Sequence, residues 1–94
     1  MEKNNKRVAI ITGSANGIGK SIAEKFINQN MIVILVDLDE ENLKKTILEI
    51  DPLKQNTISA KLDISSEQDI EQLKSIVEKK FGYLDILVNN AGIA

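Results

Sequence analysis

The chain has 94 residues, 43% of them hydrophobic and 28% charged, which suits one small globular domain. The net charge is -2 without a lysine or arginine cluster, and no apolar run approaches the roughly 20 residues of a membrane span, so nothing favours nucleic-acid binding or membrane insertion. The chain contains neither cysteine nor histidine, which excludes thiol catalysis, cysteine-ligated metal sites and histidine general-base catalysis. The missing cysteine and the polar residues 1–7, which do not resemble a secretory signal, predict a cytoplasmic protein.

Strand-like and helix-like segments alternate along the whole chain. Apolar runs typical of strands buried in a parallel sheet occupy Val8–Thr12, Ile32–Val36, Thr57–Leu62 and Leu84–Val88. Helical periodicity is expected from Ile18 to about Asn28, from Glu40 (capped by Asp39) to Ile50, and from Ser65 or Ser66 to Gly82, with Ser65 and Gln68 at the spacing of a capping box. The pattern predicts a βαβαβαβ α/β domain.

A glycine-rich turn joins the first strand to the first helix. Residues 12–19 read Thr-Gly-Ser-Ala-Asn-Gly-Ile-Gly. Such a turn aims the free N–H groups and the positive dipole end of the helix at a bound anion, so it predicts phosphate binding. Gly13 permits the tight turn, Gly17 leaves room for a pyrophosphate, and Gly19 allows close packing of the helix. The alternative is a tight turn without a ligand. The predicted site takes in Gly13, Ser14, Asn16, Gly17, Ile18 and Gly19.

Acidic residues follow the second and third predicted strands. Asp37 can accept hydrogen bonds from both ribose hydroxyls of an adenosine and would repel a 2′-phosphate. Neither Asn16 nor Leu38 supplies a compensating cation, which favours NAD over NADP. The alternative is that Asp37 merely opens the next helix with Asp39. Asp63, with the Ile64 backbone beside it, could contact an adenine, or could instead cap the third helix.

Four motifs occur in order along the chain: Thr12-Gly13-x-x-x-Gly17-x-Gly19, Asp37, Leu62-Asp63-Ile64, and Asn89-Asn90-Ala91-Gly92 after Asp85-Ile86-Leu87-Val88. With these motifs the sequence resembles the short-chain dehydrogenase/reductase family, and the resemblance covers nearly the whole chain. It implies a Rossmann-like parallel sheet with strand order 3-2-1-4, and NAD(H) as cofactor. It also implies that Asn90, Ala91 and Gly92 lie against the cofactor, and that the paired asparagines join the fourth strand to the first. Asp85, at the opposite end of its strand, is expected to be structural.

The family's catalytic residues are a serine, a tyrosine with a lysine four places on, and an asparagine, all of which follow the Asn-Asn-Ala-Gly motif. The only tyrosine here is Tyr83, with Leu87 four places on, so no catalytic residue is predicted. The chain has no cysteine and no histidine, and no metal ligand is predicted either. We expect residues 1–94 to be the cofactor-binding part of a single domain, truncated after the fourth strand, with an exposed apolar edge at Leu84–Val88.

The resemblance further implies a parent enzyme that oxidises an alcohol or reduces a carbonyl and assembles as a dimer or tetramer. The alternatives are a catalytically inactive nucleotide-binding fragment and an NAD-sensing module.

Overall fold

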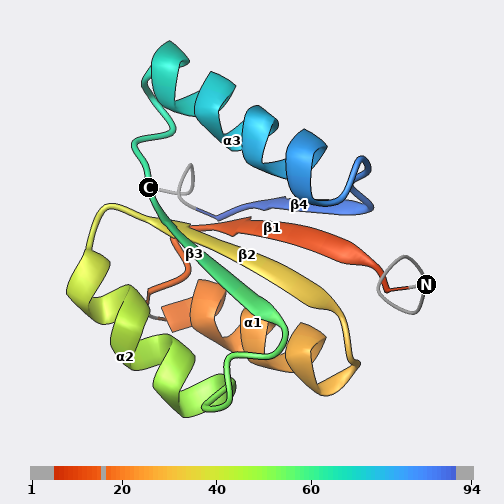
Figure 1. Cartoon of the computed structure of the whole chain (residues 1–94). Coiled ribbons are helices and arrows are strands. Elements are labelled where there is room, and N and C mark those ends of the chain that lie inside the picture. Colours follow the sequence, from red (N-terminus) through yellow and green to blue (C-terminus); the bar gives the residue numbers. More distant parts are fainter. Residues whose placement is uncertain (1–5, 16, 91–94) are drawn as a thin grey trace.

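Four parallel strands form one sheet, and a helix connects each strand to the next (Figure 1). The computed structural model describes residues 6–15 and 17–90. The elements are β1 (Val8–Thr12), α1 (Gly17–Asn28), β2 (Ile32–Asp37), α2 (Glu40–Ile50), β3 (Thr57–Lys61), α3 (Glu67–Lys80) and β4 (Ile86–Asn89). The strand order is β3-β2-β1-β4, which confirms the predicted Rossmann-like sheet.

The helices cover both faces of the sheet. Figure 1 shows α1 and α2 against one face and α3 against the other. The chain steps from β1 through β2 to β3 and then crosses back to β4, and because such crossovers are right-handed, the change of direction puts α3 on the opposite face. The direction in which successive strands are added to the sheet therefore reverses between β1 and β4. In open parallel sheets, ligands bind outside the carboxyl ends of the strands at this reversal point.

Two hydrophobic clusters, one on each face, hold these layers together. Alternate residues of β1 and β2 belong to different clusters, because successive side chains of a strand point to opposite faces. Ile10 and Ile34 pack with Leu73 and Val77 of α3. Ile11 packs on the other face with Ala23 of α1 and Leu43 of α2. β1 and the apolar residues of β2 are buried on both sides, as their continuous apolar runs predicted.

Most helix ends follow the local sequence signals. Asp39 caps α2 by accepting the N–H of Asn42. Asn30 follows α1 with a φ of 63°, in the left-handed conformation expected of an asparagine there. The predicted capping box of Ser65 with Gln68 is wrong. Ser66 is the N-cap of α3 and accepts the N–H of Asp69, while Ser65 donates to Asp63 instead.

β4 begins two residues later than predicted because Asp85 takes part in the sheet through its side chain. The N–H of Val8 donates to Asp85 Oδ2 at 2.8 Å, in place of a backbone carbonyl, and the Asp85 N–H donates to the Val8 carbonyl. Regular pairing then runs from Ala9 opposite Ile86 to Thr12 opposite Asn89. Asp85 is therefore structural, as expected.

β4 is an edge of the sheet, since within residues 6–15 and 17–90 it pairs only with β1. Leu87 lies opposite Ile10, on the α3 face, yet its side chain is 60% exposed. The expected apolar surface on this strand is present. None of the helices in the described part of the chain is both long and apolar enough to cross a membrane.

Candidate functional site

The glycine turn has the backbone geometry that its sequence predicted. Gly13 and Gly17 have φ values of 63° and 62°, where a side chain would be strained. α1 begins at Gly17 and has no acidic residue in its first turn. A Cβ at Gly17 would meet no atom of the described residues within 4 Å. The turn therefore leaves open space beside the positive end of a helix, which is a suitable place for an anion.

Gly19 allows α1 to pack closely on the residues that follow β1 and β4. A Cβ at Gly19 would lie 2.3 Å from the Gly13 carbonyl oxygen and 2.9 Å from Asn90 Nδ2. Asn90 Nδ2 itself donates to the Gly13 oxygen at 3.0 Å. A glycine here lets α1 approach the turn and the end of β4 at once. The turn, the helix and the asparagine motif thus meet at one point.

The paired asparagines join β4 to β1, as the resemblance implied. Thr12 Oγ1 donates to Asn89 Oδ1 at 3.2 Å, and Asn90 holds the Gly13 carbonyl immediately after β1. Both bonds lie at the carboxyl ends of the strands, where the glycine turn starts. The predicted contacts Asn16, Ala91 and Gly92 lie outside the described residues.

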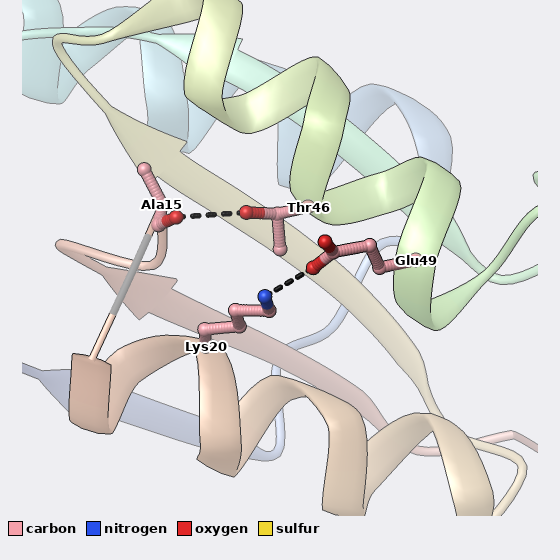
Figure 2. A network of polar contacts seen from close by, with 4 residues as sticks. All are labelled: Ala15, Lys20, Thr46 and Glu49. Carbon is pink, nitrogen blue, oxygen red and sulfur yellow. Dashed lines mark hydrogen bonds and ion pairs between the residues drawn. The ribbon is translucent and has the colours of Figure 1, made fainter.

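Hydrogen bonds from two further elements hold the turn in place. Ser14 is fully buried, and both its N–H and its hydroxyl donate to the Val36 carbonyl. This places Ser14 beneath the turn rather than at its surface. The Ala15 N–H donates to Asp37 Oδ2 at 3.1 Å. The Ala15 carbonyl accepts from Thr46 Oγ1 at 2.8 Å, the bond that Figure 2 shows.

Ala15 and Thr46 belong to the hydrogen bonds that hold the turn, although the sequence motifs do not point to them. The available signal was a polar residue at position 46, within the arc of helix α2 that carries the buried Leu43, Ile47 and Ile50. A polar side chain on the buried face of a helix needs a hydrogen-bond partner, because an unpaired buried polar group is costly. The identity of that partner could not be read from the sequence.

Asp37 lies at the end of β2, half-buried, with both carboxylate oxygens engaged by the backbone. Oδ2 accepts the Ala15 N–H and Oδ1 accepts the Asp39 N–H, each at 3.1 Å. Asp39, rather than Asp37, is the N-cap of α2. Asp37 therefore links the glycine turn to the start of α2, and it also lines the cavity described next.

A cavity of about 280 Å³ opens at the carboxyl ends of β1, β2 and β3. It brings together several residues predicted from distant parts of the sequence. Its lining residues are Thr12, Gly13, Val36, Asp37, Leu38, Leu62, Asp63, Ile64 and Ser65. The predicted Ile18 does not line it but is exposed in the first turn of α1. The cavity combines apolar walls with two carboxylates, and the turn beside it supplies N–H groups.

Asp63 is held in an orientation fixed by its own loop. Its Oδ1 accepts the Ser65 hydroxyl at 2.7 Å and the Ser65 N–H at 2.9 Å. These hydrogen bonds hold the pKa of the Asp63 carboxyl below its usual value. The Asp63 N–H donates to Asp69 in α3. Asp63 thus has a structural role in the loop before α3 while it also faces the cavity.

Tyr83 lies at the other end of the sheet from this cavity. Its hydroxyl donates to the carbonyl of Lys6, just before β1, whereas the cavity lies where β1 ends. Among the described residues there is no group of histidine, cysteine or acidic side chains that could hold a metal ion. What this site can do chemically is accept an anion at α1 and hydroxyl or amino groups at its carboxylates.

The parallel order β3-β2-β1-β4 with a glycine turn after β1 defines a Rossmann-like α/β protein. Residues 7–94 match the family described as short chain dehydrogenase. The chain belongs to this family, whose members are dehydrogenases and reductases.

Individual relatives agree with this assignment. The chain is 39% identical over 87 residues to an (S)-acetoin-forming diacetyl reductase from Staphylococcus epidermidis, covering 93% of this chain and 34% of that protein. A short-chain dehydrogenase/reductase from Burkholderia phymatum in complex with NAD has a TM-score of 0.80 at 29% identity, covering 93% of this chain and 31% of that one. A metagenomic short-chain oxidoreductase in complex with NADP has a TM-score of 0.85 at 34% identity, covering 93% and 39%. The chain thus spans about a third of the length of the relatives it matches.

Proposed function

We propose that this chain binds NAD(H), as the cofactor-binding part of a short-chain oxidoreductase. The observation that carries the proposal is the meeting of the glycine turn, Asp37 and Asp63 around one cavity. The pyrophosphate would lie at the first turn of α1, beside the open space at Gly17. The adenosine would occupy the cavity, with its ribose hydroxyls at Asp37 and its adenine between Leu38 and the Asp63–Ser65 loop. Asn90 would lie on the nicotinamide side of the turn.

Preference for NAD over NADP follows from the charge at the end of β2. The Asp37 carboxylate would repel a 2′-phosphate, and the next residue, Leu38, is exposed and uncharged. A carboxylate at this place accepts the ribose hydroxyls of NAD. The relatives include complexes with NAD and with NADP, so support for NAD comes from this chain's own residues.

The reaction we propose is hydride transfer between NAD(H) and an alcohol or carbonyl substrate. The nicotinamide supplies the hydride, and the residues described here bind and orient the cofactor. The family's tyrosine and lysine pair is not among these 94 residues. We therefore expect the 94 residues alone to show no turnover with a panel of alcohols or carbonyls. A substantial rate would contradict this assignment.

A second candidate is a nucleotide-binding module without catalysis, including one that senses NAD. In its favour, Tyr83 is the only tyrosine in the 94 residues and its hydroxyl is bound to Lys6 away from the cavity, so these residues place no tyrosine at the site. We further propose a cytoplasmic location and a homo-oligomer, a dimer or tetramer. The exposed Leu87 on β4 is an apolar surface that further polypeptide could cover.

Titration of NADH and NADPH against the wild type and two variants tests the proposal. We expect the wild type to prefer NADH. Asp37→Arg should weaken NADH binding by about tenfold or more, because it removes hydrogen bonds from the ribose hydroxyls to a charged group, and should shift the ratio of affinities toward NADPH. The ratio of NADH to NADPH affinity is the decisive quantity, because Asp37→Arg also removes the hydrogen bond from the Ala15 N–H, and that loss would weaken the binding of both cofactors alike.

Asp39→Ser is the matched control. It removes a carboxylate two residues away but keeps a side chain that can cap α2. Its ratio of NADH to NADPH affinity should equal that of the wild type. A wild type that binds neither cofactor, or an unchanged ratio in Asp37→Arg, would refute the proposed function.

A further inference from the structure

We propose that Thr46 of α2 is a positioning residue for the phosphate-binding turn. Its side chain is 2% exposed, and its hydroxyl donates to the Ala15 carbonyl at 2.8 Å (Figure 2). The two residues are 31 positions apart in the sequence. The inference rests on the proposed binding of a pyrophosphate at this turn, and it assigns to α2 a part in that binding.

The bond from Thr46 completes the anchoring of one peptide segment. Ala15 donates its N–H to Asp37 Oδ2 and accepts the Thr46 hydroxyl at its carbonyl, so β2 holds one end of the residue and α2 the other. Ala15 lies two positions before Gly17, where α1 begins. Fixing Ala15 therefore anchors the turn close to the start of the helix.

The direction of the Thr46 hydroxyl supports a specific role. A threonine within a helix commonly donates to the carbonyl one turn earlier in the same helix. Here the hydroxyl instead reaches the glycine turn. The ion pair of Lys20 in α1 with Glu49 in α2 joins the two helices rather than the turn, and because it is partly exposed it is expected to contribute little. Thr46 thus supplies a buried hydrogen bond from α2 to the turn, beside the hydrophobic cluster that Ala15 shares with Leu43 and Ile47.

Removal of the hydroxyl would leave the buried Ala15 carbonyl without this donor. The turn could then recover a hydrogen bond only by changing its conformation or admitting water. The apparent dissociation constant of a ligand rises as the binding-competent fraction of the protein falls. We expect a population shift of about tenfold, the size that the loss of one buried hydrogen bond produces.

The test uses ADP, which carries the adenosine and pyrophosphate of NAD, and adenosine, which lacks the phosphates. In Thr46→Val, ADP should bind about 5 to 20 times more weakly than in the wild type, while adenosine affinity changes less than about twofold. Thr46→Ser keeps the hydroxyl and should restore ADP binding to within about twofold. If Thr46→Val does not fold, Thr46→Ala removes the same hydroxyl.

Thr57→Val is the matched control. Thr57 Oγ1 donates to Asp51 Oδ2 at 2.9 Å, at the opposite end of β3 from the cavity, so this variant also loses one threonine hydrogen bond. It should lower the free energy of unfolding while ADP affinity stays within about twofold of the wild type. ADP affinity of Thr46→Val within the same limits would show that Thr46 has only a structural role, and would overturn the inference.

Amide hydrogen exchange separates this inference from the proposed function. In the ligand-free protein, Thr46→Val should speed exchange of the Ala15 amide by about tenfold relative to Thr57→Val, because the turn opens locally. Equal rates in the two variants would overturn the inference whether or not nucleotides bind. The wild type could bind neither ADP nor NADH while the Ala15 amide still exchanges faster in Thr46→Val than in Thr57→Val. This result would refute the proposed function and leave Thr46 as the anchor of the turn.

Discussion

Gly17 and Gly82 offer a matched pair for locating the phosphate site. Both have positive φ values, 62° and 79°, and within residues 6–15 and 17–90 a Cβ at either would meet nothing closer than 4 Å. Gly17 opens α1 at the cavity end of the sheet. Gly82 follows α3, near the start of β4 at the opposite end. Substitution by alanine therefore imposes the same kind of backbone strain at both positions and adds a methyl group to the glycine turn only in Gly17→Ala.

The expected loss of stability is similar for the two variants. A left-handed conformation costs a non-glycine residue about 1–2 kcal/mol. Replacing glycine also reduces the entropy of the unfolded chain, which offsets about 0.4–1 kcal/mol. The net loss is about 1 kcal/mol, equivalent to a fall in Tm of about 4–8 °C for a domain of this size. Urea or thermal unfolding measures it.

Binding should separate the two variants. The Gly17→Ala methyl projects into the space assigned to the pyrophosphate and should weaken NADH by about tenfold or more, because overpacking typically costs 1–3 kcal/mol. Gly82→Ala should change the NADH dissociation constant by less than about twofold. Calorimetric titration of both variants checks this. If Gly17→Ala bound NADH as tightly as Gly82→Ala, the pyrophosphate would not lie at this turn.

Three further outcomes are expected. Gly19→Ala places a methyl 2.3 Å from the Gly13 carbonyl oxygen and should lower the free energy of unfolding by about 1–3 kcal/mol, more than Gly17→Ala does. If urea unfolding gave the same loss of stability for both variants, this contact would be contradicted. Burial raises the pKa of the Asp51 carboxyl, but backbone and threonine hydrogen bonds outweigh it and keep the pKa below its usual value. Asp51 therefore stabilises the fold above about pH 4, and this contribution is lost as pH falls through the lowered pKa, so unfolding curves of Asp51→Asn and the wild type should converge in acid. Tyr83→Phe removes the hydrogen bond to the Lys6 carbonyl and should cost about 1 kcal/mol with unchanged NADH affinity, whereas a tenfold loss of affinity would contradict its placement far from the cofactor.

Local chemistry explains why much of the fold was predictable. The buried strands β1 and β2 are short apolar runs, and their neighbours signal where they end. The cap of α2 at Asp39 depends on residues at most three positions apart. The error at the start of α3 has the same origin, since Ser65 and Ser66 offer equivalent caps. Only the competing bond of Ser65 to Asp63 decides between them.

The candidate site was predictable where a residue's role follows from its place at a strand end. Asp37 and Asp63 both follow strands, and parallel strands bring their carboxyl ends to one edge, so their shared cavity follows from topology. The position of Ser14 in the glycine turn predicts that it belongs to the site. Its burial and its hydrogen bond to the Val36 carbonyl depend on how closely β2 approaches the turn. The residues next to Ser14 in the sequence do not reveal that distance.

The sequence by itself determined the succession of strands and helices along the chain, the glycine turn and the family. These depend on periodicity, capping and short motifs within a few residues. Only the tertiary structure decided how the turn is held: by Asp37 at the Ala15 N–H, by Thr46 at its carbonyl, and by Asn90 at Gly13. These partners lie 22, 31 and 77 positions away. Hydrogen bonds across such separations form only after the helices and strands have packed, so their geometry belongs to the fold as a whole.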